Sequence, residues 1–318
     1  MKIYFQCIGN KLHEIACEAK DEVVIVAPFM KANVIVRLLE AVSKSVSIIC
    51  ITRWRPDEIV QGLNDLEIWD YINKRDNAIM LLHGNLHAKY YRFDDTVLIG
   101  SANLTGKALG WTSNPNLELL SEHPKEFTET RFFEESLCEL STKVNGYIYD
   151  YMLELVKRYK EKQQIDCKSE NISYEIIDEL PMQQNATVWI PKLRKPELLF
   201  KVYSKDTNYI IETTVQSACF DLLSLQIPPG LDEDGFNVYV KSMLLQQPII
   251  KKMDSYLTEP QRFGAMREYL REYYFKNEID LDPTMSWQVI MRWLLYYLPD
   301  IYGLNVPNHS EVIYKKYQ

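Results

Sequence analysis

The chain has 318 residues, about the length of two ordinary domains, and its 47% hydrophobic and 25% charged residues are typical of a globular protein with a real core. No apolar stretch reaches the roughly 18 residues that a membrane-spanning helix needs, so a membrane partner is not expected. The formal net charge of −8 argues against a uniformly basic surface that coats nucleic acid, because such binding depends on Lys and Arg contacts to phosphates. A local basic groove remains possible.

The six cysteines are scattered along the chain, without a Cys-x-x-Cys pair or a cluster with histidines. Disulfide frameworks and zinc sites are therefore not expected. We expect the cysteines to be buried thiols in a reducing cytoplasm. The first ten residues contain a single lysine and no small-residue cleavage site after an apolar run. We therefore expect a cytoplasmic protein rather than a secreted one.

The N-terminal part of the chain alternates apolar runs, of which residues 23–27 are also β-branched, with helical patterns. Strands are predicted at residues 23–27, 46–51 and 78–82, and helices at residues 32–43 and 56–74. Strands that alternate with helices in this way predict an α/β domain.

The pattern changes after residue 85. Residues 86–93 and 96–100 predict two strands joined by a two-residue turn, and residues 116–120 predict one more short strand. Residues 124–164 are charged and helical in pattern, so they could form a bridging helix between domains.

A domain boundary is predicted where the sequence becomes polar and contains three prolines. Residues 166–196 are interpreted as a linker between a domain of residues 1–165 and a mostly helical domain of residues 197–318. The second domain begins with two strand-like pieces, and its aromatic residues at helical spacing predict core packing or a dimer surface. Its strand-like pieces and clearest helices span residues 198–203, 209–214, 261–275 and 286–298.

One short segment carries residues suited to phosphate chemistry. His87 and Lys89 are two positions apart, so on a strand both point to the same face. The lysine ammonium can neutralise phosphoryl oxygens, and the imidazole can attack phosphorus or move protons near neutral pH. Asp94 follows at an odd spacing, which predicts a structural role at the turn rather than a direct catalytic one.

The predicted hairpin poses a problem of register. A two-residue turn pairs Lys89 with Gly100, which puts Ser101 and Asn103 on the face opposite the lysine. The two polar residues can meet a phosphate only with a longer turn, a bulge, or a bend of the chain at Gly100. The glycine favours the bend.

The sequence contains, in this order, His87-x-Lys89, Asp94 after four further residues, and Gly-Ser101-x-Asn103. This arrangement resembles the complete motif of the phospholipase D superfamily. The resemblance implies a phospholipase D-like mixed sheet flanked by helices. It also implies a reaction without metal or cofactor, in which two motif copies share one site. One histidine attacks phosphorus to give a phosphohistidine, the other protonates the leaving oxygen, and the lysines and asparagines hold the phosphoryl oxygens.

The chain contains only one complete motif. Its other His-x-Lys sequence, His123-Pro124-Lys125, lacks the downstream aspartate and the Gly-Ser-x-Asn segment, and its proline suits a central strand poorly. The second histidine is therefore expected from a second chain, with the active site shared across a homodimer.

Five further residues are candidates for the site. The resemblance implies that Glu118 orients the histidine, whereas a solvated glutamate at a strand edge is the alternative. Arg53 and Arg55 end a predicted strand, where ligands gather in parallel sheets, and could grip a backbone phosphate; an ordinary surface loop is the alternative. Thr105 and Lys107 could also line the groove.

The resemblance favours a metal-independent phosphodiesterase, and above all a DNA endonuclease of a restriction or antiviral defence system. One alternative is a phospholipid hydrolase or phosphatidyltransferase of the same superfamily. Another is a catalytically silent binding or scaffold protein. The residues leave open whether DNA or RNA is cut, whether it is single- or double-stranded, and what the second domain recognises.

Overall fold

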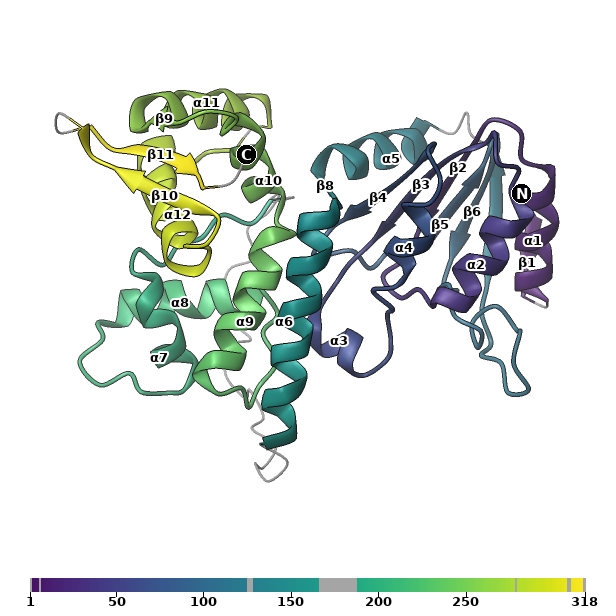
Figure 1. The fold of residues 1–318 in the computed structure, drawn as a ribbon, viewed down its shortest axis with the longest axis horizontal. Coiled ribbons are helices and arrows are strands. Elements are labelled where there is room, and N and C mark those ends of the chain that lie inside the picture. Colours follow the sequence, from purple (N-terminus) through teal and green to yellow (C-terminus); the bar gives the residue numbers. More distant parts are fainter. Residues whose placement is uncertain are drawn as a thin grey trace. The chain divides into compact units, whose positions relative to one another are not determined.

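A computed structural model of the chain describes residues 2–5, 7–124, 128–165, 188–277, 279–307 and 310–316. The chain divides into two compact units, Met1–Lys160 and Glu161–Gln318 (Figure 1). No helix within these described ranges is both long enough and apolar enough to cross a bilayer.

Within the described residues, the first unit is built on an eight-stranded mixed sheet in the order β1-β7-β6-β5-β2-β3-β4-β8. Strands β2, β3 and β4 run parallel, and the other neighbours pair antiparallel. The strands are β1 (Lys2–Tyr4), β2 (Glu22–Val26), β3 (Ser47–Thr52), β4 (Ala78–Leu82), β5 (Tyr90–Phe93), β6 (Thr96–Gly100), β7 (Leu120–Pro124) and β8 (Thr142–Lys143). The helices are α1 (Ile8–Glu18), α2 (Ala32–Ala41), α3 (Pro56–Val60), α4 (Ile68–Ile72), α5 (Thr128–Leu140) and α6 (Gly146–Ile165), which continues into the second unit.

The central strand β2 is a run of Val and Ile because helices cover both of its faces. On one face Val24 and Val26 belong to a core cluster with Leu137 of α5, and Phe133 of α5 packs against it. Helices α1, α2 and α4 lie together over the opposite face (Figure 1). The mixed sheet flanked by helices is confirmed.

Two predicted elements of this unit are wrong in extent. The predicted helix 56–74 is two short helices, α3 and α4, because the chain turns at Gly62, whose φ of 73° is left-handed. The predicted strand 86–93 begins only at Tyr90. Tyr90 pairs with Val26, the last residue of β2, and Pro28 beyond it has no N–H with which to extend the ladder.

The region from residue 116 to 164 also differs from the prediction. The strand predicted at 116–120 is wrong in position, because β7 spans Leu120–Pro124 and shares only Leu120 with it. β7 includes His123 and Pro124, although a proline suits a strand poorly. The proline is tolerated because it is the last residue of the strand, beyond the pairing with β1. The helical stretch 124–164 is two helices with the short strand β8 between them.

The second unit is mostly helical, as expected. It contains the 3₁₀ helix η1 (Pro196–Leu198), α7 (Leu199–Tyr203), α8 (Glu212–Ser224), α9 (Glu233–Leu245), α10 (Pro248–Tyr256), α11 (Phe263–Lys276) and α12 (Pro283–Tyr297). The three short strands β9 (Gln261–Arg262), β10 (Tyr302–Asn305) and β11 (Val312–Lys315) form a small sheet in the order β10-β11-β9.

The two strand-like pieces predicted in this unit are wrong. Residues 198–203 form the end of η1 and α7, and α8 begins within 209–214. The apolar residues there follow helical rather than strand spacing, because Leu199, Val202 and Tyr203 are all buried on one helical face. The aromatic residues Trp287 and Trp293 of α12 are fully buried, which confirms core packing.

Residues 166–187 of the predicted linker lie outside the described residues. Residues 188–196 pack into the second unit. The indole N–H of Trp189 donates to the buried carboxylate of Asp221, and Leu193 accepts a hydrogen bond from the indole of Trp293 (2.8 Å).

Candidate active site

The predicted hairpin is formed by β5 and β6, and Asp94 holds its turn against the rest of the sheet. Asp94 has the left-handed φ of 51° that a tight two-residue hairpin turn requires. Its carboxylate accepts hydrogen bonds from the backbone N–H groups of Lys20, Asp21 and Glu22 (2.8, 2.9 and 2.9 Å). These contacts give Asp94 a structural role at the turn.

The chain bends at Gly100, which answers the problem of register. The N–H of Gly100 donates to the carbonyl of Lys89 (3.3 Å), so the two residues are paired as the two-residue turn demands. β6 ends there, and the N–H of Ser101 donates instead to the carbonyl of Leu119 (2.9 Å). A Cβ atom on Gly100 would lie 1.9 Å from that carbonyl oxygen. Only glycine fits this bend, which redirects Ser101.

His87 and Lys89 lie on the extended segment that leads into β5. The Nζ atom of Lys89 is 3.4 Å from Nδ1 of His87 and donates a hydrogen bond to the His87 carbonyl oxygen (2.8 Å). The histidine is exposed and the lysine is half-buried. An imidazole and an ammonium group are thus held side by side at the surface.

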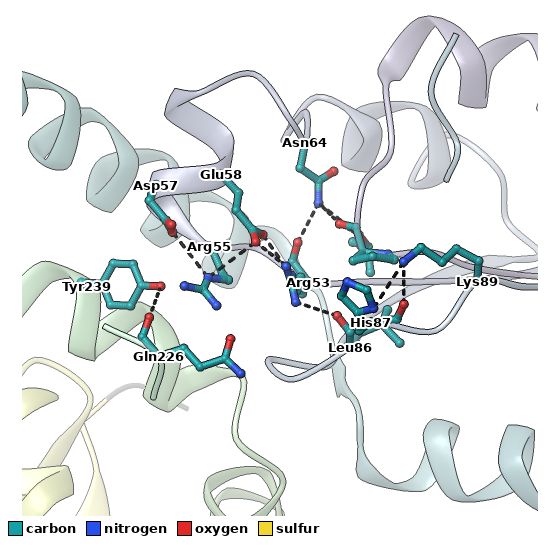
Figure 2. A network of polar contacts seen from close by, with 12 residues as sticks. Arg53, Arg55, Asp57, Glu58, Asn64, Leu86, His87, Lys89, Gln226 and Tyr239 are labelled. Atoms are coloured by element: carbon teal, nitrogen blue, oxygen red, sulfur yellow. Dashed lines mark hydrogen bonds and ion pairs between the residues drawn. The ribbon is translucent and has the colours of Figure 1, made fainter. Parts of the chain in front are cut away.

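Arg53, at the end of β3, supports the backbone beside the histidine (Figure 2). Its buried guanidinium donates to the carbonyl of Leu86 (2.9 Å) and to both carboxylate oxygens of Glu58. The side-chain amide of Asn64 donates to the Arg53 carbonyl (2.7 Å), which fixes the arginine itself. The guanidinium of Arg53 is therefore used in hydrogen bonds within the chain, and its positive charge lies near His87.

These charges lower the pKa of both motif side chains. The positive charge of Lys89 lowers the pKa of His87, and burial and the charge of Arg53 act in the same direction. Burial lowers the pKa of Lys89, Arg53 adds to the effect, and the Glu118 carboxylate opposes it. A lowered pKa keeps more of the imidazole neutral near pH 7, and the neutral ring is the form that can attack phosphorus.

Glu118 is bonded to Ser101 rather than to the histidine. Among the described residues, its carboxylate accepts hydrogen bonds from the hydroxyl of Ser101 and from the amide of Asn116 (3.1 Å). The Ser101 hydroxyl also accepts from the N–H of Leu119 (3.1 Å). The orienting contact to His87 expected for Glu118 is not among these hydrogen bonds, so Glu118 instead fixes the serine beside the lysine.

A cavity of about 610 Å³ opens beside the motif. His87, Lys89 and Ser101 line it on one side. Sequence reasoning missed its other wall, which comes from α5 and consists of Glu129, Thr130 and Phe133. Since α5 lies far along the chain from the motif, no local pattern marks these residues.

Residues 12–135 match the family described as "Cardiolipin synthase, PLD-like domain". No curated protein gave a match.

Several solved structures resemble the chain at low identity. NucT from Helicobacter pylori is 16% identical with a TM-score of 0.36, over 45% of this chain and 98% of its own. The archaeal chromatin protein TrmBL2 is 17% identical with a TM-score of 0.31, over 45% of this chain and 54% of its own. Phosphatidylserine synthase from Haemophilus influenzae is 12% identical with a TM-score of 0.38, over 100% of this chain and 82% of its own.

Residues 12–135 therefore form a phospholipase D-like domain. The matched residues include the whole motif, from His87 to Asn103, and end within α5. The resemblance read from the motif is thereby confirmed.

The other predicted residues of this phospholipase D-like unit lie outside the cavity. Arg55 is buried and paired with the carboxylates of Asp57 and Glu58 (3.5 and 3.7 Å). Thr105 accepts a hydrogen bond from the N–H of Ala108 (3.3 Å), and Lys107 is exposed. None of the three lines the cavity.

Asn103 follows the bend, on the segment that leaves the hairpin, and it too is not among the residues that line the cavity. Its Oδ1 atom is buried and has no hydrogen-bond partner among the described residues. A buried amide oxygen left without a partner costs about 1–3 kcal/mol, and a catalytic role is one explanation for such a group.

Helix α5 is held against the phospholipase D-like sheet by a buried arginine. Arg92 of β5 donates to Glu134 of α5 and to Glu22 of β2, and the Tyr90 hydroxyl donates to the same Glu134 (2.8 Å). The ring of Phe133 lies 5.5 Å from that of Tyr90. These contacts position the α5 wall of the cavity beside His87 and Lys89.

Proposed function

We propose that the protein is a metal-independent phosphodiesterase, and specifically a DNA endonuclease of a restriction or defence system that works as a homodimer. The observation that carries this proposal is the motif itself: His87, Lys89 and Ser101 converge on one cavity, and the chain holds a single copy of them.

In the proposed reaction, His87 of one subunit attacks phosphorus, and a P–N bond forms as the P–O bond to the leaving group breaks. His87 of the partner subunit gives its proton to the leaving oxygen. It then takes a proton from a water molecule, whose oxygen displaces the histidine and releases the phosphate product. Proton transfer by such a placed group is typically worth about 10²- to 10⁴-fold in rate.

The charge that develops on phosphorus is neutralised by protein cations. Lys89 supplies an ammonium group next to the attacking ring, and the symmetry-related lysine would supply a second. The side-chain NH₂ of Asn103 would donate a hydrogen bond to a phosphoryl oxygen, whereas the Ser101 hydroxyl, which already donates to Glu118, would have to turn away from that carboxylate to do the same. Fixed donors aimed at developing charge are usually the largest contribution to catalysis.

Exposure of the catalytic pair supports a polymer substrate. His87 is exposed, and the cavity beside it is open to solvent rather than enclosed within the unit. A backbone phosphate of a long strand can reach such a site without entering a deep pocket.

A lipid substrate is the second candidate, and one observation favours it. The cavity beside the motif is lined by Ala88, Ile99 and Phe133 as well as by the polar residues. An apolar wall next to the reacting phosphate would suit a diacylglycerol group. A silent scaffold is disfavoured, because the motif residues are intact and converge.

The substrate is tested with purified protein in excess EDTA. Plasmid DNA and phosphatidylglycerol vesicles are offered in parallel to the native chain and to His87→Ala. The proposal expects nicked and linear DNA with the native chain only. Release of the lipid headgroup without DNA cleavage would show that the substrate is a phospholipid rather than DNA. Inactivity of both chains on both substrates would favour a catalytically silent scaffold protein.

The shared site is tested by mixing. Native and His87→Ala chains are denatured together in varied ratios, refolded and assayed. If each active site needs one histidine from each chain, activity falls as the square of the native fraction, because only native pairs are active. A linear fall would mean that each chain acts alone.

A further inference from the structure

The second unit contains a cavity of about 900 Å³ that has no part in the site described above. One wall is the segment that leads into η1 and α7, and the other is the loop before α8 together with the first turns of that helix.

The charge of this cavity is opposite to that of the chain. Among its lining residues Lys192, Arg194, Lys195 and Lys201 are exposed cations, and Asp206 is the one carboxylate. The chain as a whole carries a formal net charge of −8. Cations gathered in one hollow of an acidic protein indicate an anionic ligand with several charges.

The basic segment is held in place by the core of the unit. The buried carboxylate of Asp221 accepts hydrogen bonds from the N–H groups of Lys192 and Leu193 (3.0 and 2.7 Å). The Nζ atom of Lys192 lies 3.7 Å from the centre of the Phe220 ring. The guanidinium of Arg292 donates to the carbonyl of Arg194 (3.2 Å), which brings a further cation to the segment. The cations are therefore arranged on a fixed backbone.

Tyr209 stands at the edge of the cavity in a strained conformation. Its side chain is fully exposed (107%), and its φ of 68° is left-handed, as is the φ of 62° at Lys205. Bulky residues rarely adopt such a φ, and they keep it mostly where the strain serves a function. Hydroxyl groups of Thr213 and Thr214 line the hollow nearby. An exposed aromatic ring beside cations and hydroxyls matches the parts of a nucleic-acid strand: base, phosphate and sugar.

We propose that this cavity binds a single strand of nucleic acid, with its phosphates against the four cations and one base stacked on Tyr209. The inference rests on the proposed function, because it supposes a nucleic-acid substrate. The phosphates, sugars and bases of a single strand can contact the cations, the threonine hydroxyls and the Tyr209 ring together, whereas a lipid headgroup offers no base to stack on the ring. The second unit thus supplies the affinity for nucleic acid that the acidic chain lacks overall.

The charges are tested by binding in the His87→Ala background, so that nothing is cleaved. Fluorescein-labelled single-stranded DNA is titrated by fluorescence anisotropy at several salt concentrations. Lys195→Glu with Lys201→Glu should weaken binding at least 10-fold and reduce the slope of log K against log salt by about 1.4, or about 0.7 for each lost contact. The matched control, Lys160→Glu with Lys276→Glu, makes the same charge change at two exposed lysines outside the cavity and should bind nearly as the parent does.

The ring is tested separately from the fold. Tyr209→Gly relieves the strained φ, so it should raise the melting temperature while weakening binding about 10-fold through loss of stacking. Tyr209→Phe should bind as the parent does. A glycine variant that binds normally would remove the ring from the proposal.

Two further arms identify the ligand. If the cavity variant and the control variant lose the same amount of DNA affinity, net charge alone drives binding, and the cavity is not the binding site. Binding to phosphatidylglycerol vesicles but not to DNA would overturn the proposal that the ligand of the cavity is a nucleic acid. Hydrolysis of bis(p-nitrophenyl) phosphate by the native chain tests the catalytic proposal independently. If the native chain hydrolyses this compound but the cavity substitutions leave DNA binding unchanged, the cavity proposal alone is wrong. If the cavity substitutions weaken DNA binding but the native chain hydrolyses nothing, the catalytic proposal alone is wrong.

Discussion

The guanidinium group of Arg53 donates a hydrogen bond to the carbonyl oxygen of Leu86, the residue before His87, at 2.9 Å. The arginine also holds Glu58 with two further hydrogen bonds, and its carbonyl is bonded to Asn64. The sequence suggested that Arg53 touches substrate. Its contacts instead make it a positioning residue, which acts on the reaction through the backbone and the charge around His87.

Arg53→Lys should therefore reduce kcat about 10- to 100-fold while KM changes little. A lysine keeps the charge but cannot reach Leu86 and both oxygens of Glu58 together, and small misplacements of a catalytic group have effects of this size. Arg75→Lys is the control, because Arg75 also donates to backbone carbonyls but lies outside the site. A loss of kcat no larger in the Arg53 variant than in the Arg75 variant would reduce Arg53 to an ordinary structural role.

The charge of Lys89 predicts a pH effect. Lys89 is the main cause of the lowered pKa of His87, so Lys89→Met should raise that pKa toward the ordinary value of about 6.5. Because only the neutral ring attacks phosphorus, the acid limb of the rate profile should move to higher pH, and the maximal rate should fall by at least about 100-fold as the phosphoryl charge loses its partner. An NMR titration of the His87 ring measures the pKa directly, and an unchanged value would contradict the electrostatic account.

Gly100→Ala should be severely destabilising, by about 3 kcal/mol or more, since the new Cβ would collide with the Leu119 carbonyl oxygen. Gly146→Ala is the control, because nothing lies within 4 Å of the added atom at the start of α6. It should be neutral or stabilising by up to about 1 kcal/mol. Chemical denaturation followed by tryptophan fluorescence compares the two, and equal stabilities would mean that the chain at Gly100 can relax.

The parts of the fold that were predicted correctly depend on neighbours in sequence. The β5–β6 hairpin follows from its two-residue turn at Asp94, and the pairing of Lys89 with Gly100 follows from the same turn. The buried strands β2, β3 and β4 follow from their continuous apolar runs. Each of these signals lies within a few residues of the structure that it determines.

The parts that were missed depend on distant contacts. Glu118 was predicted to contact His87, but its carboxylate accepts a hydrogen bond from Ser101 instead. This contact depends on the bend at Gly100, which no local sequence pattern specifies. The α5 wall of the cavity depends on Glu134, which accepts hydrogen bonds from Arg92 on a strand 42 residues away. The small helix α7 was read as a strand because its residues suit either element and tertiary burial decides between them.

The last prediction concerns Asp221, the buried carboxylate that holds the basic segment of the second unit. Burial raises its pKa to about 7, despite the hydrogen bonds from Lys192, Leu193 and Trp189, which act the other way. The unfolded carboxyl has a pKa of about 3.9, so the folded chain keeps a proton that the unfolded chain releases between these values. The contribution of Asp221 to stability is therefore greatest at acid pH and is lost as pH rises toward 7.

Asp221→Asn should lower the free energy of unfolding by about 2–4 kcal/mol, because the new amide NH₂ faces backbone N–H groups that need an acceptor. The stability difference between native chain and variant should widen as the pH falls from 8 to 5, which is the direction set by the raised pKa. Thermal unfolding across that range measures the difference. DNA binding by the variant at pH 7 should also weaken, since Lys192 and Leu193 lose the carboxylate that orders them. A difference in stability that stays constant with pH would show that Asp221 is ionised in the folded chain.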